Sequence, residues 1–309
     1  MTESHSPAAR VVILTTGPLD GPHEQVRGAL SPLGASCEDL RVLSDGVDGV
    51  SAGEIGCTGA SLTELRDAVD ALDLGSGTDV AVVPETVAAP GRRLLIMDVD
   101  STLIRDEVIE LLADHPGKRA EVAAVTERAM RGELDFTQSL HARVATLAGL
   151  PATVLDETRA RVRVTPGART LVRTLKSLGD TVAVVSGGFI EVVQPLADDL
   201  GIDHARANRL EVVDGTLTGR VLGDVVDRTV KEASLREFAA ADGLSMDRTV
   251  AVGDGANDLD MLGAAGLGVA FNAKPIVQEQ ASAAINTPRL DSVLYYLGLR
   301  RDEFVAAHD

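Results

Sequence analysis

The chain has 309 residues, of which 45% are hydrophobic and 25% charged, a composition typical of a folded globular protein and not of a disordered one. Acidic residues outnumber basic residues 47 to 29, and the resulting formal net charge of −18 argues against a protein that binds nucleic acid or anionic membrane surfaces. Aromatic residues make up only 2% of the chain, which leaves few side chains to stack on bases or sugars.

The cysteine content and the lengths of the apolar runs indicate the cellular compartment of the protein. Cys37 and Cys57 are the only cysteines, too few for a disulfide framework and without metal-ligand spacing, so we interpret them as free thiols in a reducing compartment. The N-terminus lacks a basic start followed by an apolar stretch, and no run of about 18 apolar residues occurs in the chain. We therefore expect a cytoplasmic protein that does not span a membrane.

The acidic charge is concentrated near the N-terminus. Residues 1–90 carry four arginines, no lysine and fourteen acidic residues, a net charge of −10, whereas the other 219 residues carry −8. This change in composition, at the Pro90-Gly91 pair, predicts a boundary between an N-terminal domain over 1–90 and a larger domain over 91–309.

The predicted elements of the N-terminal domain follow the order strand, helix, strand, strand, helix, strand, which is that of ferredoxin-like domains. Ser61 with Glu64 three residues later forms a capping-box pattern at the start of the second helix. The strands are expected over 11–14, 37–43, 52–57 and 80–83, and the first helix over 23–33.

This βαββαβ order, with the Gly-Pro-Leu-Asp-Gly-Pro turn at 17–22, resembles the ACT domain, a small regulatory module that binds ligands. Our hypothesis is that residues 1–90 bind an amino acid or mediate homodimerisation, and that their removal leaves the chemistry of the larger domain intact. A ferredoxin-like domain that binds no ligand is the alternative.

In the larger domain, short apolar runs alternate with helical segments, a pattern that predicts an α/β fold built on a doubly wound parallel sheet. A long helical insert over 106–158 follows the first strand, and we expect it to cover the carboxyl end of that strand, where such sheets bind ligands. The strands are expected over 94–99, 181–185, 249–252 and 267–270, the helices over 167–179 and 231–241, the end of a further helix at 196–200, and a hairpin over 211–218.

Two carboxylates, those of Asp98 and Asp100, end the first predicted strand of this domain. Side chains two residues apart in an extended chain point to the same side, so both can face one site. Paired carboxylates next to a core are unfavourable unless a cation or a proton compensates them, and their oxygens favour a hard cation such as Mg²⁺. The alternative is that the two aspartates only solvate the end of the strand.

Three later segments also place polar groups at predicted strand ends or helix starts. Small residues after a buried strand let backbone N–H groups approach an anion, and acids on a glycine-rich turn suit a metal site. Taken singly, each has an ordinary explanation: a common strand-to-helix turn, a solvated lysine, and a polar turn that lacks the spacing and final Glu of a calcium loop. The residues are Ser186 with Gly187 and Gly188, then Lys231, and then Asp254, Asn257 and Asp258.

In this order, the four segments resemble the haloacid-dehalogenase-type phosphatase superfamily over roughly residues 92–290. Two stretches are similar to the branch of that superfamily that hydrolyses phosphoserine: Asp98 to Glu110, and residues 129–144, which include Phe136 and Arg143. The resemblance implies a helical cap at about 105–165. Asp100 argues against haloacid dehalogenation, because dehalogenases lack this second acid.

The resemblance also implies the catalytic roles. Asp98 would be the nucleophile that forms an aspartyl-phosphate, and Asp100 the general acid and base. Mg²⁺ would be held by Asp98, the backbone carbonyl of Asp100, and Asp254. The groups implied for binding phosphate are Ser186, Gly187, Lys231 and Asn257, with Asp258 supporting Lys231 or a metal-bound water.

The cap residues at the family's substrate positions imply a small phosphorylated amino acid. Glu107 would pair with the ammonium group, Arg143 would take the carboxylate as a fork, and Phe136 would exclude water. The implied reaction is hydrolysis of O-phospho-L-serine to L-serine and phosphate, the last step of serine biosynthesis.

Two alternatives from other classes stay open at this point. The same fold can act on another phosphomonoester, such as a phosphoprotein, a nucleotide or a sugar phosphate, or the chain can be a non-catalytic amino-acid sensor. The arginines at 159, 161 and 163 could suggest a phosphate patch, but we interpret them as a solvated stretch that leads back to the sheet.

Overall fold

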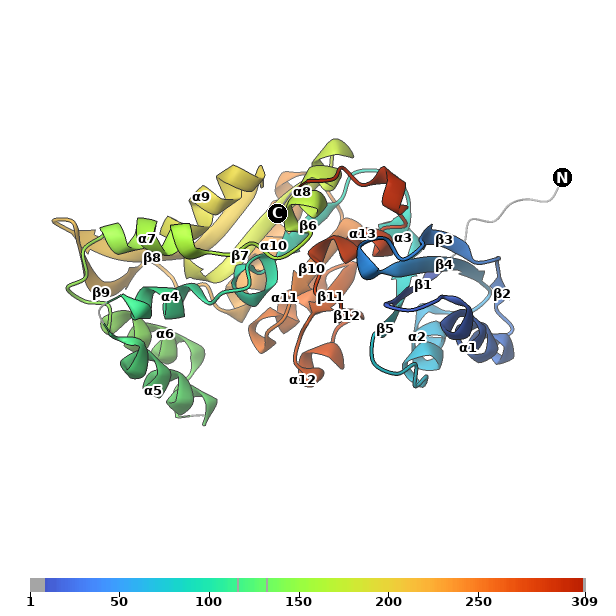
Figure 1. Cartoon of the computed structure of the whole chain (residues 1–309), viewed down its shortest axis with the longest axis horizontal. Coiled ribbons are helices and arrows are strands. Elements are labelled where there is room, and N and C mark those ends of the chain that lie inside the picture. The colour runs from blue at the N-terminus through green and yellow to red at the C-terminus, as the bar shows by residue number, and fades with distance from the viewer. Residues whose placement is uncertain (1–8, 116, 132, 308–309) are drawn as a thin grey trace.

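The computed structural model describes residues 9–115, 117–131 and 133–307, and it contains two sheets. In Figure 1 the N-terminal sheet lies at one end of the molecule, the larger sheet in the middle, and the helices that follow the first strand of the larger sheet at the other end. None of the described helices is long and apolar enough to cross a membrane.

The N-terminal sheet is antiparallel, with β1 in its centre between β4 and β5. Two helices cover one face of this sheet, where Val11 and Ile13 pack with Val26, Leu30 and Leu65. The predicted βαββαβ order is thereby confirmed in outline. The elements are β1 Ala9–Thr15, α1 Asp20–Leu30, β2 Ser36–Cys37, β3 Arg41–Ser44, β4 Ser51–Thr58, α2 Leu62–Asp70 and β5 Thr78–Pro84.

The prediction of one continuous strand over 37–43 was wrong, because the chain forms two short strands, β2 and β3, which both pair with β4. The intervening residues leave the ladder and lay the side chains of Glu38 and Leu40 over Gly56 and Gly53 of β4, where any Cβ atom would collide with them. The glycines of β4 therefore allow the break, which hydrophobic periodicity alone does not reveal.

The larger sheet has the order β12-β11-β10-β6-β7-β8-β9 and is parallel except for β9, which forms the predicted hairpin with β8. This arrangement confirms the predicted α/β fold with a mostly parallel sheet. The strands are β6 Leu94–Met97, β7 Thr181–Phe189, β8 His204–Val213, β9 Thr216–Leu222, β10 Thr249–Gly253, β11 Leu267–Phe271 and β12 Ala283–Ile285.

Helices cover both faces of this sheet, as in doubly wound folds. On one face, Leu95 and Met97 of β6 pack in a core that includes residues of α8, α9 and α13. On the other face, Leu94 and Ile96 pack against α10, α11 and α12. The helices are α8 Ala168–Ser177, α9 Ile190–Leu200, α10 Arg228–Ala241, α11 Leu259–Ala264, α12 Pro275–Gln278 and α13 Val293–Tyr296, and α3 Glu85–Ala88 joins the two sheets.

The cap inserted between β6 and β7 contains four helices. Its two connections to the sheet run side by side, because Ile104 and Val164 form an antiparallel bridge and the N–H of Arg105 donates to the carbonyl of Arg163 at 2.9 Å. The cap therefore joins the core through one narrow double connection. The helices are α4 Val108–Asp114, α5 Arg119–Met130, α6 Phe136–Ala145 and α7 Thr153–Arg161, and positions 116 and 132 of the cap lie outside the described residues.

The second face of the N-terminal sheet is buried against the C-terminal part of the chain. One continuous core contains Val12 and Leu14 of β1 together with Tyr295 and Leu299. At its border, the Arg41 guanidinium donates to the carbonyl of Gly298 at 2.7 Å. The two sheets are therefore joined by a shared apolar core in addition to their covalent link.

Candidate active site

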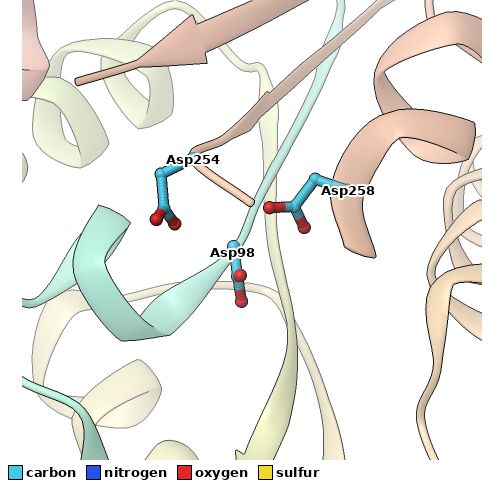
Figure 2. Close-up of side chains that lie close together, drawn as sticks. All are labelled: Asp98, Asp254 and Asp258. Carbon is cyan, nitrogen blue, oxygen red and sulfur yellow. The ribbon is translucent and has the colours of Figure 1, made fainter. Parts of the chain in front are cut away.

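The predicted polar segments meet at the carboxyl ends of neighbouring strands. β6 lies between β10 and β7, so the ends of these three strands bring together Asp98, Asp254 and Ser186. Figure 2 shows that the side chains of Asp98, Asp254 and Asp258 lie close together. Carboxylate oxygens of these three aspartates lie within 4.8 Å of one another.

Lys231 is completely buried between two of these carboxylates. Its ammonium group lies 2.7 Å from Asp98 Oδ2 and 2.7 Å from Asp258 Oδ1. Burial lowers the pKa of Lys231, but the two carboxylates outweigh burial and raise it above its ordinary value. The lysine is therefore charged, and Asp258 lies where the sequence places a support for Lys231.

Asp98 is itself almost fully buried, 5% exposed, and its Oδ1 accepts the N–H of Val99 at 2.7 Å. Burial and the neighbouring Asp258 carboxylate raise the pKa of Asp98 well above its ordinary value, although Lys231 opposes the shift. Burial and Asp258 also raise the pKa of Asp254 to about 6. The ammonium group of Lys231 contacts two of these three carboxylates, and its single positive charge does not balance three negative charges.

This donor set fits a hard divalent cation. Mg²⁺ prefers carboxylate and other oxygen ligands, and it would compensate the excess negative charge that, after burial, raises these pKa values. The three aspartates that lie close enough to share one cation are Asp98, Asp254 and Asp258. Asp258 was not predicted to be a metal ligand, and the side chain of Asp100 is not part of this group. The sequence assigned only the backbone carbonyl of Asp100 to the metal, and that assignment stays a prediction.

Asp100 lies in a tight turn over Val99–Leu103, in which Ser101 has a left-handed backbone with φ 57°. Asp100 Oδ1 accepts the N–H of Val108, at the start of the cap, at 2.9 Å, and Oδ2 accepts the hydroxyl of Ser186 at 3.3 Å. Burial and the negative charge of Glu107 raise the pKa of Asp100 to about 7.

The small residues after β7 bring backbone close to these acids. The hydroxyl of Ser186, which is fully buried, accepts the N–H of Gly188 at 2.7 Å. A Cβ atom at Gly188 would lie 2.8 Å from Asp100 Oδ2 and 3.0 Å from Ser186 Oγ. Position 188 therefore has no room for a side chain while Asp100 and Ser186 keep their places.

We expect Gly188→Ala to lower kcat by roughly 10- to 100-fold, because the added methyl group displaces Asp100 and Ser186 from their positions. Steady-state kinetics on the variant, with circular dichroism to confirm the fold, measures the effect. Gly263→Ala is a matched control, since no atom lies within 4 Å of a Cβ at that helical position. Equal activity of the two variants would contradict the close packing at position 188.

Residues of the cap and of the sheet together line a cavity of about 890 Å³, near the upper end of the size range of small-molecule sites. Glu107, Phe136 and Arg143 all line it together with Asp98 and Asp100. The structure thus brings the three cap residues predicted from the sequence to one cavity with the two motif aspartates.

Within the cavity, Phe136 covers the glycine turn, because its Cζ would lie 2.9 Å from a Cβ at Gly187. Arg143 is partly buried, and its Nε donates to the carbonyl of Ser139 at 3.3 Å. Burial lowers the pKa of Arg143, and the charge of Glu107 opposes the shift. Asn257 also lines the cavity, from the turn after β10.

The three cap arginines lie apart from these groups, as expected. Arg159, Arg161 and Arg163 pair with Asp156, Asp114 and Asp106, at distances of 3.2, 2.7 and 2.6 Å. They are exposed and do not line the cavity.

Sequence reasoning missed two hydroxyl groups of the first motif. Ser101 Oγ donates to Glu107 Oε1 at 2.8 Å, and Thr102 Oγ1 donates to Asp254 Oδ1 at 3.2 Å. Both residues follow directly after Asp100. Their hydroxyl groups orient two acids that lie elsewhere in the chain, Glu107 and Asp254. The signal available in the sequence was their position in the motif, but their partners depend on the fold.

The fold and the site agree with comparisons to known proteins. A family model for haloacid dehalogenase-like hydrolases matches residues 95–263, more than half of the chain. The chain therefore belongs to the haloacid dehalogenase-like hydrolases, as the resemblance of its motifs implied.

A narrower assignment comes from individual relatives. A phosphoserine phosphatase of Streptomyces coelicolor is 60% identical over 258 residues, a match that covers 84% of this chain but only 63% of that protein, less than two thirds of its length. A phosphoserine phosphatase of Mycobacterium tuberculosis is 47% identical over 306 residues, covering 97% of this chain and 74% of the relative. Within the hydrolase family, the chain is a member of the phosphoserine phosphatases.

A solved structure of a phospho-aspartyl intermediate analogue of phosphoserine phosphatase superimposes with a TM-score of 0.63 and 43% identity. The match covers 66% of this chain and 98% of that one.

Proposed function

We propose that this protein hydrolyses O-phospho-L-serine to L-serine and inorganic phosphate through an aspartyl-phosphate formed on Asp98. The observation that carries the proposal is the single cavity that contains both motif aspartates, Asp98 and Asp100, and the two charged cap residues, Glu107 and Arg143. A phosphorylated amino acid carries a phosphate, an ammonium group and a carboxylate, and the cavity is lined by Gly187 and Asn257 for the phosphate, Glu107 for the ammonium group and Arg143 for the carboxylate.

The first step is attack of an Asp98 carboxylate oxygen on phosphorus, which forms the acyl-phosphate bond while the bond between phosphorus and the serine oxygen breaks. Asp100 donates a proton to that leaving oxygen. In the second step, Asp100 takes a proton from a water molecule as the water oxygen attacks phosphorus, and the bond from phosphorus to Asp98 breaks. Asp98 returns as a carboxylate and phosphate leaves.

Charge neutralisation supplies much of the catalysis, because a nucleophilic anion must approach a phosphate. Lys231, Ser186 and the backbone N–H of Gly187 would contact the phosphoryl oxygens, with Asn257 helping to position them. Asp98, Asp254 and the backbone carbonyl of Asp100 would hold Mg²⁺. When bound, Mg²⁺ supplies positive charge to the phosphoryl oxygens.

At the other end of the cavity, Glu107 pairs with the substrate ammonium group and Arg143 binds its carboxylate through two parallel hydrogen bonds. The hydroxyl of Ser101, which donates to Glu107 at 2.8 Å, holds the acid in place for this contact. Phe136, which lies over Gly187, keeps bulk water away from the phosphorus atom.

Arg143→Ala tests the substrate. We expect kcat/KM for free phosphoserine to fall about 100-fold, mostly through KM, because a desolvated charge-assisted contact to the substrate carboxylate is lost. Hydrolysis of a phosphopeptide, which lacks a free carboxylate at that position, should change by less than about threefold. Turnover of phosphoserine, phosphothreonine and a phosphopeptide by both proteins, measured as released phosphate, gives the comparison.

Two further variants sharpen that test. Arg143→Lys keeps the charge but loses the planar fork, so it should recover only part of the lost activity. Arg159→Ala removes a cap arginine outside the cavity and should behave like the wild type. No preference of the wild type for free phosphoserine would exclude the proposed substrate and favour a phosphatase for another phosphomonoester.

We further propose that the chain divides into an N-terminal unit over 1–90 and a catalytic unit over 91–309. The ferredoxin-like strand order of the first unit supports this division, and so does the different chain direction within its sheet. For the N-terminal unit we propose binding of an amino acid or formation of a homodimer. Equilibrium dialysis with serine and sedimentation of the full chain separate the two roles.

A further inference from the structure

Asn208 lies on β8, opposite an irregular part of β7. The register between the two strands pairs Ser186 with Ala207 and then Phe189 with Asn208, so Gly187 and Gly188 form a bulge that no residue of β8 faces. Such a bulge interrupts the regular ladder of backbone hydrogen bonds. The bulge is also the segment that approaches Asp100 in the active site.

The carboxamide of Asn208 takes the place of the interrupted ladder. Its Nδ2 donates to the carbonyl of Gly187 at 2.8 Å, and its Oδ1 accepts the N–H of Val226 at 2.8 Å. The side chain is 1% exposed, so water does not compete for these contacts. One amide group thus joins two segments that are not adjacent in the chain.

The first contact reaches the general acid through a short chain of hydrogen bonds. The carbonyl of Gly187 and the N–H of Gly188 belong to one planar peptide, so fixing the first atom also fixes the direction of the second. The N–H of Gly188 donates to Ser186 Oγ at 2.7 Å, and Ser186 Oγ donates to Asp100 Oδ2 at 3.3 Å.

The hydrogen bond between Asn208 and Val226 fixes the chain just before the helix that carries Lys231. Val226 directly precedes Asp227, whose side chain caps α10 by accepting the N–H of Val230 at 3.0 Å. Lys231 lies in the first turn of this helix, with its ammonium group between Asp98 and Asp258. The position of residue 226 therefore sets where α10 begins.

We propose that Asn208 is a positioning residue for phosphoryl transfer, which holds the glycine bulge and the start of α10 at a fixed separation. This inference rests on the proposed function, because it assigns the bulge and Lys231 to the phosphoryl group. Asn208 does not line the cavity and acts through Gly187 and Val226. The role requires one donor and one acceptor on a short planar group, which an amide of this length provides.

The test compares Asn208→Leu with Leu210→Ala. Leucine is close in size to asparagine but has no polar atom, so both contacts are lost. Leu210 lies two residues further along the same strand and is 4% exposed, so its truncation destabilises β8 without touching the bulge. For both variants and the wild type, the measurements are kcat and KM for phosphoserine, calorimetric binding of inorganic phosphate with Mg²⁺ present, and the melting temperature.

We expect Asn208→Leu to weaken binding of inorganic phosphate about tenfold and to lower kcat by roughly 10- to 100-fold at a temperature where the protein is folded. Leu210→Ala should lower the melting temperature at least as much as Asn208→Leu does, but it should change the affinity for inorganic phosphate by less than about twofold. Equal losses of phosphate affinity in the two variants would overturn the proposal, because the effect would then follow stability alone.

Asn208→Ala is the second variant, because alanine also removes both contacts but places no branched apolar side chain beside the bulge. If neither Asn208 variant folds while Leu210→Ala does, the residue is needed for folding and the positioning role is wrong. Binding of inorganic phosphate separates this proposal from the proposed function. A wild-type protein that binds phosphate but does not hydrolyse phosphoserine would refute the substrate and leave the role of Asn208 testable.

Discussion

Asp98→Asn should lower kcat for phosphoserine by at least roughly 10⁴-fold, the scale of losses seen when a catalytic nucleophile is removed. The amide has the size of the carboxylate and can keep the contact with the N–H of Val99, but it is a much weaker nucleophile. The substitution also removes one of the two negative charges that flank Lys231. The expected loss is therefore one of chemistry, with little change in fold.

Release of inorganic phosphate with Mg²⁺ present measures this effect, and EDTA should abolish the wild-type rate in the same assay. Asp114→Asn is a matched control, because Asp114 lies on the cap surface and pairs with Arg161 outside the cavity. The melting temperature reports whether each variant is folded. Turnover within tenfold of the wild type in Asp98→Asn would assign the nucleophile to another residue.

The sequence was sufficient to predict the alternation of strands and helices and the four polar segments at strand ends or at the start of a helix. Asp98 and Asp254 could be placed together because each follows a buried apolar strand, and the carboxyl ends of parallel strands meet at one edge of a sheet. The cap residues Glu107 and Arg143 were predicted only through the resemblance to a family, since nothing in their local sequence distinguishes them from solvated helix residues.

What the sequence could not provide are contacts whose partners are set by the fold. Asn208 is one polar residue within a strand, and its role depends on a bulge in the neighbouring strand β7. Similarly, the break between β2 and β3 depends on two glycines of β4, over which Glu38 and Leu40 pass. In both cases the deciding partner lies on another strand, so local pattern and propensity do not reveal it.

The packing of the N-terminal sheet also changes the expectation for a chain that lacks residues 1–90. The sequence alone suggested that this segment is a removable appendage. In the structure, one face of its sheet shares a core with Leu294, Tyr295 and Tyr296, each at most 3% exposed. Truncation would uncover part of this apolar surface at the end of the molecule away from the cap.

For the truncated chain 91–309 we expect a melting temperature lower by roughly 10 °C or more. Burial of an apolar side chain contributes about 1.5–3 kcal/mol, and about 1 kcal/mol corresponds to roughly 2–4 °C in a domain of this size. We expect kcat at 20 °C to stay within about threefold of the full chain, because none of the described residues that line the active-site cavity belongs to residues 1–90. Calorimetry, light scattering and steady-state kinetics measure these effects.

Asn286→Ala in the full chain is the matched control for that truncation. Asn286 donates its backbone N–H to Asp79 at 2.8 Å and its side-chain amide at 2.7 Å, across the same boundary. Loss of the side-chain hydrogen bond should lower the free energy of unfolding by about 1 kcal/mol, and the melting temperature by a few degrees. A truncated chain as stable as the full one would show that the shared core adds no stability, whereas a folded truncated chain without turnover would show that residues 1–90 take part in catalysis.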